Sequence, residues 1–195
     1  MENILPPKLL REISDVPEEL YIRGTYPNEE RYLFLTIVGS RNGTHYGKQV
    51  CKSIIQSLKN HPVVIVSGLA IGIDTYAHEY ALEYGLPTIA VLGSGLSKKV
   101  IYPPSNRHLA QRIIDSGGCL ISEYPLDFTP KKWSFPQRNR IMAGISHAVL
   151  VIEAEDHSGT GITARLAYEY NREVLCIPGS IFSPFSKGSN KLIAE

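Results

Sequence analysis

The sequence predicts a doubly wound α/β domain with a mostly parallel sheet. Short apolar runs such as residues 32–39 are typical of strands that are buried on both faces. Helical segments of 10 to 15 residues separate these runs, as expected for right-handed crossovers between parallel strands. A chain of 195 residues with 43% hydrophobic side chains can bury the core of one such domain.

The predicted elements follow one another in a regular order. Residues 1–19 form a proline-rich, acidic lead-in segment, and the domain is expected to occupy residues 20–195. Strands are expected at the apolar runs 20–24, 32–39, 63–68, 88–93, 119–124, 148–154 and 174–179. Helices are expected in the intervals, near residues 46–59, 74–84, 106–116, 136–145 and 162–171. This alternation predicts helices on both faces of the sheet.

Charge is distributed unevenly along the chain. Residues 1–30 carry a net charge of −4 and the remaining residues carry +5, which gives the whole chain a net charge of +1. A net charge this small does not attract a polyanion over long distances. Binding to nucleic acid would therefore depend on local clusters of basic side chains.

Composition disfavours several classes of protein and ligand. No apolar run approaches the roughly 20 residues that cross a bilayer, and the first residues lack a secretion signal, which favours a cytoplasmic protein without membrane contact. Cys51, Cys119 and Cys176 are far apart and are expected to be reduced. No metal site is expected, because the histidines form no close pair. No cofactor is expected, because no loop has the glycine pattern that binds NAD or ATP.

The segment from Phe135 to Ser146 is the most informative part of the chain. Residues 131–140 contain four basic side chains and no acidic one. Arginine forks pair with phosphate oxygens, a helix N-terminus adds N–H donors, and an aromatic ring offers a face to a nucleobase. The alternative is an amphipathic helix whose apolar residues face the core and whose arginines are solvated.

The loops after the strands form a second candidate site. Ligands of parallel sheets bind at the carboxyl ends of the strands, where such loops gather. Residues 39–47, 67–74, 92–103 and 155–164 are rich in glycine, and several of them carry hydroxyl or basic side chains. Together these loops favour an anion-binding crevice, whereas each loop alone also fits ordinary turns and helix caps.

Enzymatic signatures are poor. No GxSxG motif is present, and no serine has an obvious base beside it. Asp74 and His78 lie one helical turn apart, which favours a structural bond between them over acid–base catalysis. Glu153 ends a buried strand near the expected crevice and is interpreted as a loop anchor that accepts hydrogen bonds from backbone N–H groups. The chain is therefore expected not to be an enzyme.

Several motifs in this order resemble the DprA/Smf family of DNA-processing proteins of natural transformation. The motifs are GSR at 39–41, SGLAIGID at 67–74, TIAVLGSGL at 88–96, IYPPSN at 101–106, ISEYP at 121–125, FPQRNRIMAGIS at 135–146, VLVIEA at 149–154, SGTGITA at 158–164 and VLCIPGS at 174–180. The resemblance covers roughly residues 20–195. It implies an extended Rossmann-like fold and a protein that binds and shields single-stranded DNA, helps to load the RecA recombinase, and forms a homodimer.

The resemblance also implies a set of nucleic-acid-binding residues. These are Ser40, Arg41, Gly68, Leu69, Ala70, Gly72, Asp74, Lys132, Phe135, Arg138, Asn139, Arg140, Ser158 and Gly159. Lys132 is expected to contact a phosphate and Phe135 to stack on a base. The helical domain that commonly precedes the family's Rossmann-like part and the winged-helix domain that commonly follows it are not expected in this chain.

The alternative to a DNA-binding protein is a nucleotide-binding protein or an enzyme that hydrolyses nucleoside monophosphates. The family is distantly similar to the "lonely guy" phosphoribohydrolases, whose motif ends in a glutamate. Thr163 fills the matching position in this chain, so Glu153 or Glu169 would have to replace that acid. Residues 181–186 are expected either to form a dimer interface or to cover the edge of the sheet.

Overall fold

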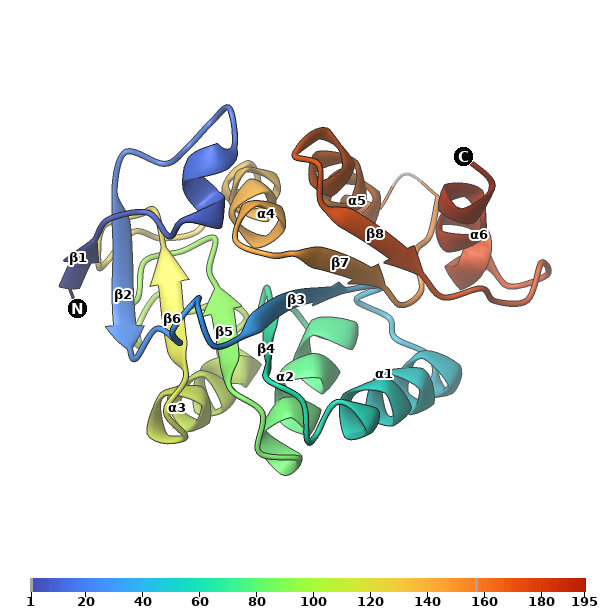
Figure 1. The fold of residues 1–195 in the computed structure, drawn as a ribbon, viewed down its shortest axis with the longest axis horizontal. Helices are drawn as coiled ribbons and strands as arrows, with labels where there is room; N and C mark the ends of the chain where they lie inside the picture. The colour runs from blue at the N-terminus through green and yellow to red at the C-terminus, as the bar shows by residue number, and fades with distance from the viewer. Residues whose placement is uncertain (1, 157) are drawn as a thin grey trace.

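An eight-stranded mixed sheet forms the centre of the protein in the computed structural model, which describes residues 2–156 and 158–195 (Figure 1). The strands lie in the order β1-β2-β6-β5-β4-β3-β7-β8. Their bounds are β1 Glu2–Ile4, β2 Leu20–Gly24, β3 Leu33–Val38, β4 Val63–Ser67, β5 Thr88–Val91, β6 Cys119–Ser122, β7 Ala148–Val151 and β8 Glu173–Cys176. Strands β3 to β8 pair in parallel, and only β1 and β2 are antiparallel additions at one edge.

Helices cover both faces of this sheet, which confirms the predicted doubly wound α/β class (Figure 1). On one face lie α1 His45–Ser57, α2 Ile73–Glu83 and α3 Arg107–Asp115. On the other face lie the 3₁₀-helix η1 Leu9–Glu12, α4 Ser134–Gly144 and α5 Gly159–Glu169. Shorter helices are η2 Pro104–Asn106, η3 Pro184–Ser186 and α6 Lys187–Ala194, the last of which packs beside β8.

The alternation of side chains along each strand divides the core into two layers. In β4, Val64 and Val66 face η1, α4 and α5, whereas Val63 and Ile65 face α1 and α2. All four side chains are buried, as expected for a strand covered on both faces. The apolar runs in the sequence are continuous because helices cover both faces of these strands.

The predicted lead-in packs against the domain. Leu10 and Ile13 are buried in the same core layer as α4, and a side chain added at Gly144 would come within 2.8 Å of Leu10. Arg172 donates to the Glu12 carboxylate at 2.9 Å and to Leu9 O at 2.8 Å. Residue 1 of the predicted lead-in and residue 157 of the last glycine-rich loop lie outside the described residues. The boundary at residue 20 stays a prediction.

Two strands mark the place where the winding of the sheet reverses. β3 lies at the centre and pairs with β4 on one side and with β7 on the other. In doubly wound sheets a ligand crevice forms at the carboxyl ends of the strands at such a switch point. Among the described helices, none is long and apolar enough to cross a membrane.

Candidate nucleic-acid interface

A crevice of about 400 Å³ opens at the carboxyl ends of β3 and β7. It brings together the predicted residues Ser40, Arg41, Ala70, Asp74, Phe135, Arg138, Asn139, Ser158 and Gly159. Three of the four predicted glycine-rich loops, together with α4, therefore meet at the switch point of the sheet. The loop at residues 92–103 does not line this crevice, contrary to the prediction.

The first two loops lie against each other at one wall of the crevice. Gly72 has a φ of 80°, and a Cβ there would meet the backbone oxygens of Ser40 and Arg41. The Ile73 amide donates to Ser40 O at 3.2 Å. Close packing of the two backbones therefore explains the glycine and holds Arg41 at the rim.

Arg41 is the exposed cation of the crevice. Its guanidinium carbon lies 5.9 Å from the centre of the Phe135 ring, and it makes no ion pair with any described residue. The Phe135 ring is half-buried, so one part of it faces the opening. The guanidinium lies over the ring, so the rim carries a cation and an aromatic ring together, and such a pair can contact a phosphate and a base of the same DNA strand.

Arg138 has a different environment from the predicted one. It is buried, and Nη1 donates to Gly68 O at 2.7 Å and to Val91 O, which ties the end of β4 to the end of β5. Burial lowers the pKa of the guanidinium to about 10, against the opposing effect of Asp74. The arginine lines the crevice floor, but its Nη1 is bonded to the protein's own backbone and its Nε donates to Asn139 Oδ1 at 3.2 Å. It is therefore a buried structural side chain and not an exposed phosphate fork.

Asp74 supports the same floor. Its Oδ2 accepts from the backbone amides of Gly68 at 3.1 Å and Ala70 at 3.3 Å. Burial raises the pKa of this carboxyl, although Arg138 and the two amides act in the opposite direction. The carboxylate therefore shapes the second loop from within.

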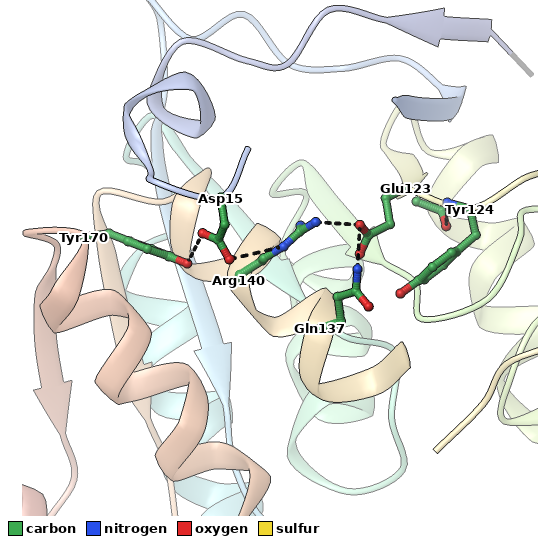
Figure 2. Close-up of polar contacts among 7 residues, drawn as sticks. Asp15, Glu123, Tyr124, Gln137, Arg140 and Tyr170 are labelled. Atoms are coloured by element: carbon green, nitrogen blue, oxygen red, sulfur yellow. Dashed lines mark hydrogen bonds and ion pairs between the residues drawn. The ribbon is translucent and has the colours of Figure 1, made fainter. Parts of the chain in front are cut away.

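Arg140 points away from the crevice, contrary to the expected basic surface. Figure 2 shows its guanidinium between two carboxylates: Nη2 lies 2.6 Å from Glu123 Oε2, and Nε lies 3.4 Å from Asp15 Oδ2. Gln137 donates to the same Glu123 oxygen at 3.3 Å, and the Tyr170 hydroxyl donates to Asp15 at 2.5 Å. This network ties α4 to the N-terminal segment, so Arg140 is not available to DNA in this conformation.

The start of α5 forms the opposite wall. Ser158 precedes the first turn, and its Oγ is buried without a hydrogen-bond partner among the described residues. Asn139 donates through Nδ2 to Gly159 O at 3.3 Å, which holds this turn against α4. The first N–H groups of a helix have no partner within the helix, so they give this wall anion-binding donors.

The other predicted residues lie around the crevice instead of in its lining. Gly68 and Leu69 are buried beneath it, and Gly72 packs behind the first loop. Lys132 is exposed in the turn before α4. Lining residues that the sequence interpretation missed include Asn42, Glu155, Thr160 and Thr163. Their only signal was their place within the glycine-rich loops.

Two acid–base candidates have structural roles. Glu153 is buried and accepts from the Thr44 amide at 3.0 Å and the Thr44 hydroxyl at 2.5 Å, so it anchors the start of α1 as predicted. It does not line the crevice, which weakens its assignment as a replacement catalytic acid. The predicted bond between Asp74 and His78 is wrong, because His78 Nδ1 lies 2.8 Å from the Thr88 hydroxyl instead.

Comparison with known proteins agrees with this architecture. Residues 4–195 match the family described as DNA recombination-mediator protein A. Protein Smf of Escherichia coli (strain K12) is 42% identical to this chain. The matched part covers 97% of this chain and 50% of that relative. This chain thus spans about half of that relative.

Two solved structures are also similar. DNA processing protein A from Streptococcus pneumoniae has a TM-score of 0.87 and 42% identity, over 96% of this chain and 65% of that one. DNA processing protein A from Helicobacter pylori, described by its single-stranded DNA binding mode, has a TM-score of 0.86 and 34% identity, over 100% of this chain and 86% of that one.

Proposed function

The chain belongs to the DNA recombination-mediator protein A family, and on that premise we propose that it binds single-stranded DNA in the crevice at the carboxyl ends of β3 and β7. Its biological role would be to protect incoming single strands during natural transformation. The single-stranded DNA binding described for the Helicobacter pylori relative supports this proposal.

One observation carries the assignment of the site. The exposed Arg41, the half-buried Phe135 ring and the start of α5 surround one crevice at the switch point. These groups match a phosphate, a base and a second phosphate of a flexible strand. A rigid duplex would have its bases stacked inside, where Phe135 could not reach them.

The family relation extends the proposal to partners. We infer that the chain assists loading of a RecA-type recombinase, acts as a homodimer, has no catalytic turnover and works in the cytoplasm. The exposed side chains of Ile181 and Phe182 beside the edge strand β8 are compatible with a dimer contact. Light scattering of the purified chain would test the dimer.

A salt series tests the central proposal. The purified chain is titrated against fluorescent oligo-dT and against a duplex of equal length between 50 and 300 mM salt. If about three phosphates are neutralised, log K for the single strand falls with log salt at a slope of about −2. Equal affinity for the duplex, or no binding to oligo-dT in low salt, would contradict the proposal.

A further inference from the structure

Three flat side-chain groups are neighbours at the rim of the crevice, with Phe135 adjacent to both of the others. The Arg41 guanidinium lies 5.9 Å from the Phe135 ring centre, and the Phe135 ring lies 5.6 Å from the Tyr102 ring. Tyr102 comes from the loop after β5 and is not part of the crevice lining. These neighbours therefore connect the crevice to the loop after β5.

Tyr102 has the properties of a stacking platform on a fixed support. Its side chain is 50% exposed although it belongs to a well-packed loop. Asn106, four residues later, donates through Nδ2 to Leu69 O at 2.9 Å and to the Thr75 hydroxyl at 2.8 Å, which fastens this loop to the second loop. Arg107 donates to Ile101 O at 3.3 Å and so holds the residue before Tyr102. An exposed ring on a fixed backbone loses little entropy when it binds.

The angle between the two rings decides how they could be used. The planes of Phe135 and Tyr102 are inclined by 51°. Rings at this angle cannot enclose one base between parallel faces, so each ring offers its face to a different base. Consecutive bases of a single strand can rotate independently, whereas stacked bases of a duplex cannot.

The charges on the two sides of α4 indicate on which side a bound DNA strand would leave the crevice. A cavity of about 690 Å³ on the far side shares Pro136 with the crevice and is lined by the carboxylates of Asp15, Glu18, Glu19 and Glu123. Arg140 is the basic residue in that lining, and it is already paired (Figure 2). This side repels a polyanion. The loop that carries Tyr102 has instead the exposed Lys98 and Lys99 and no acidic residue between positions 92 and 106.

We propose that Tyr102 stacks on a second base and that the strand leaves the crevice over Phe135 and Tyr102 toward Lys98 and Lys99. This inference rests on the proposed function and adds a path and a footprint to it. Binding of the first nucleotides in the crevice does not require it. The Tyr102 loop is thus a separate, testable part of the interface.

Tyr102→Ala is the central test, with Tyr102→Phe and Tyr168→Ala as matched variants. Tyr168 is 79% exposed on α5 and controls for the loss of an exposed tyrosine elsewhere. Affinity is measured for oligo-dT and for an equally long strand of abasic sites. We expect Tyr102→Ala to bind oligo-dT about 5- to 100-fold more weakly, the range of one lost stacking contact. The abasic strand has no base to stack, so Tyr102→Ala and the wild-type chain should bind it with equal affinity.

The lysines are tested by the salt dependence. Lys98→Ala together with Lys99→Ala should make the salt slope shallower by up to about 1.4, whereas Tyr102→Ala should leave the slope unchanged. Unchanged oligo-dT affinity in Tyr102→Ala, or an unchanged slope in the double lysine variant, would overturn the proposed path while the wild-type chain still binds. Failure of the wild-type chain to bind oligo-dT would overturn both this path and the proposed function.

Discussion

At the scale of single residues, Arg41 and Arg138 differ in what their guanidinium groups can still bind. Arg41 is exposed and makes no ion pair among the described residues, so its guanidinium can take a phosphate as its charged partner. We expect Arg41→Ala to weaken oligo-dT binding about tenfold in low salt and to make the salt slope shallower by about 0.7. Arg112→Ala, at an exposed position on α3, is the control. Equal losses in both variants would contradict a specific role for Arg41.

Arg138 should instead govern stability. Its removal takes away the donor that Gly68 O and Val91 O share and leaves the buried Asp74 without its neighbouring positive charge. We expect Arg138→Met to lower the free energy of unfolding by about 3–5 kcal/mol in urea titrations. Weakened DNA binding at unchanged stability would show that Arg138 reaches the ligand directly.

His78 predicts an acid-sensitive fold. Burial lowers the pKa of its imidazole from 6.5 to about 3. Between these two pH values the imidazole is protonated in the unfolded chain and neutral in the folded chain. This contribution to stability is complete above pH 6.5 and is lost as the pH falls toward 3. Between pH 7 and 5 the loss is about 2 kcal/mol. The raised pKa of Asp74 acts in the opposite sense, because it favours protonation in the folded chain.

Urea unfolding of the wild-type chain and of His78→Asn at pH 7 and pH 5 isolates the histidine. The substitution should lower stability at pH 7, where the bond to Thr88 is lost, and flatten the change between the two pH values. An equally steep change in His78→Asn would assign the acid sensitivity to another group.

At the scale of elements, sequence periodicity was sufficient for most of the sheet but not for the orientation of α4. The strands β3 to β8 are apolar runs because both of their faces are covered, and this cause leaves a clear pattern. The three-residue β1 and the eight-residue α6 were missed because such short elements hold too few apolar positions to show a period.

The direction of the α4 side chains could be predicted only in part. Residues two positions apart on a helix lie about 200° apart, so Arg138 and Arg140 had to diverge. Which of them faces the crevice depends on the packing of α4 against η1 and α5, which a single sequence does not reveal. The crevice residues in the loops were easier to predict because parallel strands bring their carboxyl ends to one edge.

Glu153 couples β7 to the start of α1. Its φ of 70° is unfavourable for a residue with a side chain, and the bonds to Thr44 hold it in place. We expect Glu153→Ala to lower the free energy of unfolding by about 2–3 kcal/mol and to speed hydrogen exchange at residues 40–46. Exchange that speeds up uniformly over the whole chain would contradict this local anchoring.

At the scale of the whole molecule, the distribution of charge determines on which side of α4 DNA can bind, but it does not attract DNA strongly from a distance. The net charge of +1 does not steer DNA from a distance, and the four carboxylates of Asp15, Glu18, Glu19 and Glu123 lie together on the far side of α4. Local cations at the rim therefore have to supply the affinity. This arrangement makes the salt slope a direct measure of how many of them contact phosphate.

Removal of the N-terminal segment tests whether the domain begins at residue 20. A chain of residues 20–195, the predicted domain, lacks the buried Leu10 and Ile13 and also lacks Asp15, a partner of Arg140. Losing the two apolar side chains should lower the free energy of unfolding by at least about 3–5 kcal/mol. Urea unfolding would measure this loss, with Leu10→Ala in the full chain as a milder comparison. An equally stable truncated chain would support the boundary at residue 20 and would mean that the lead-in adds contacts without adding stability.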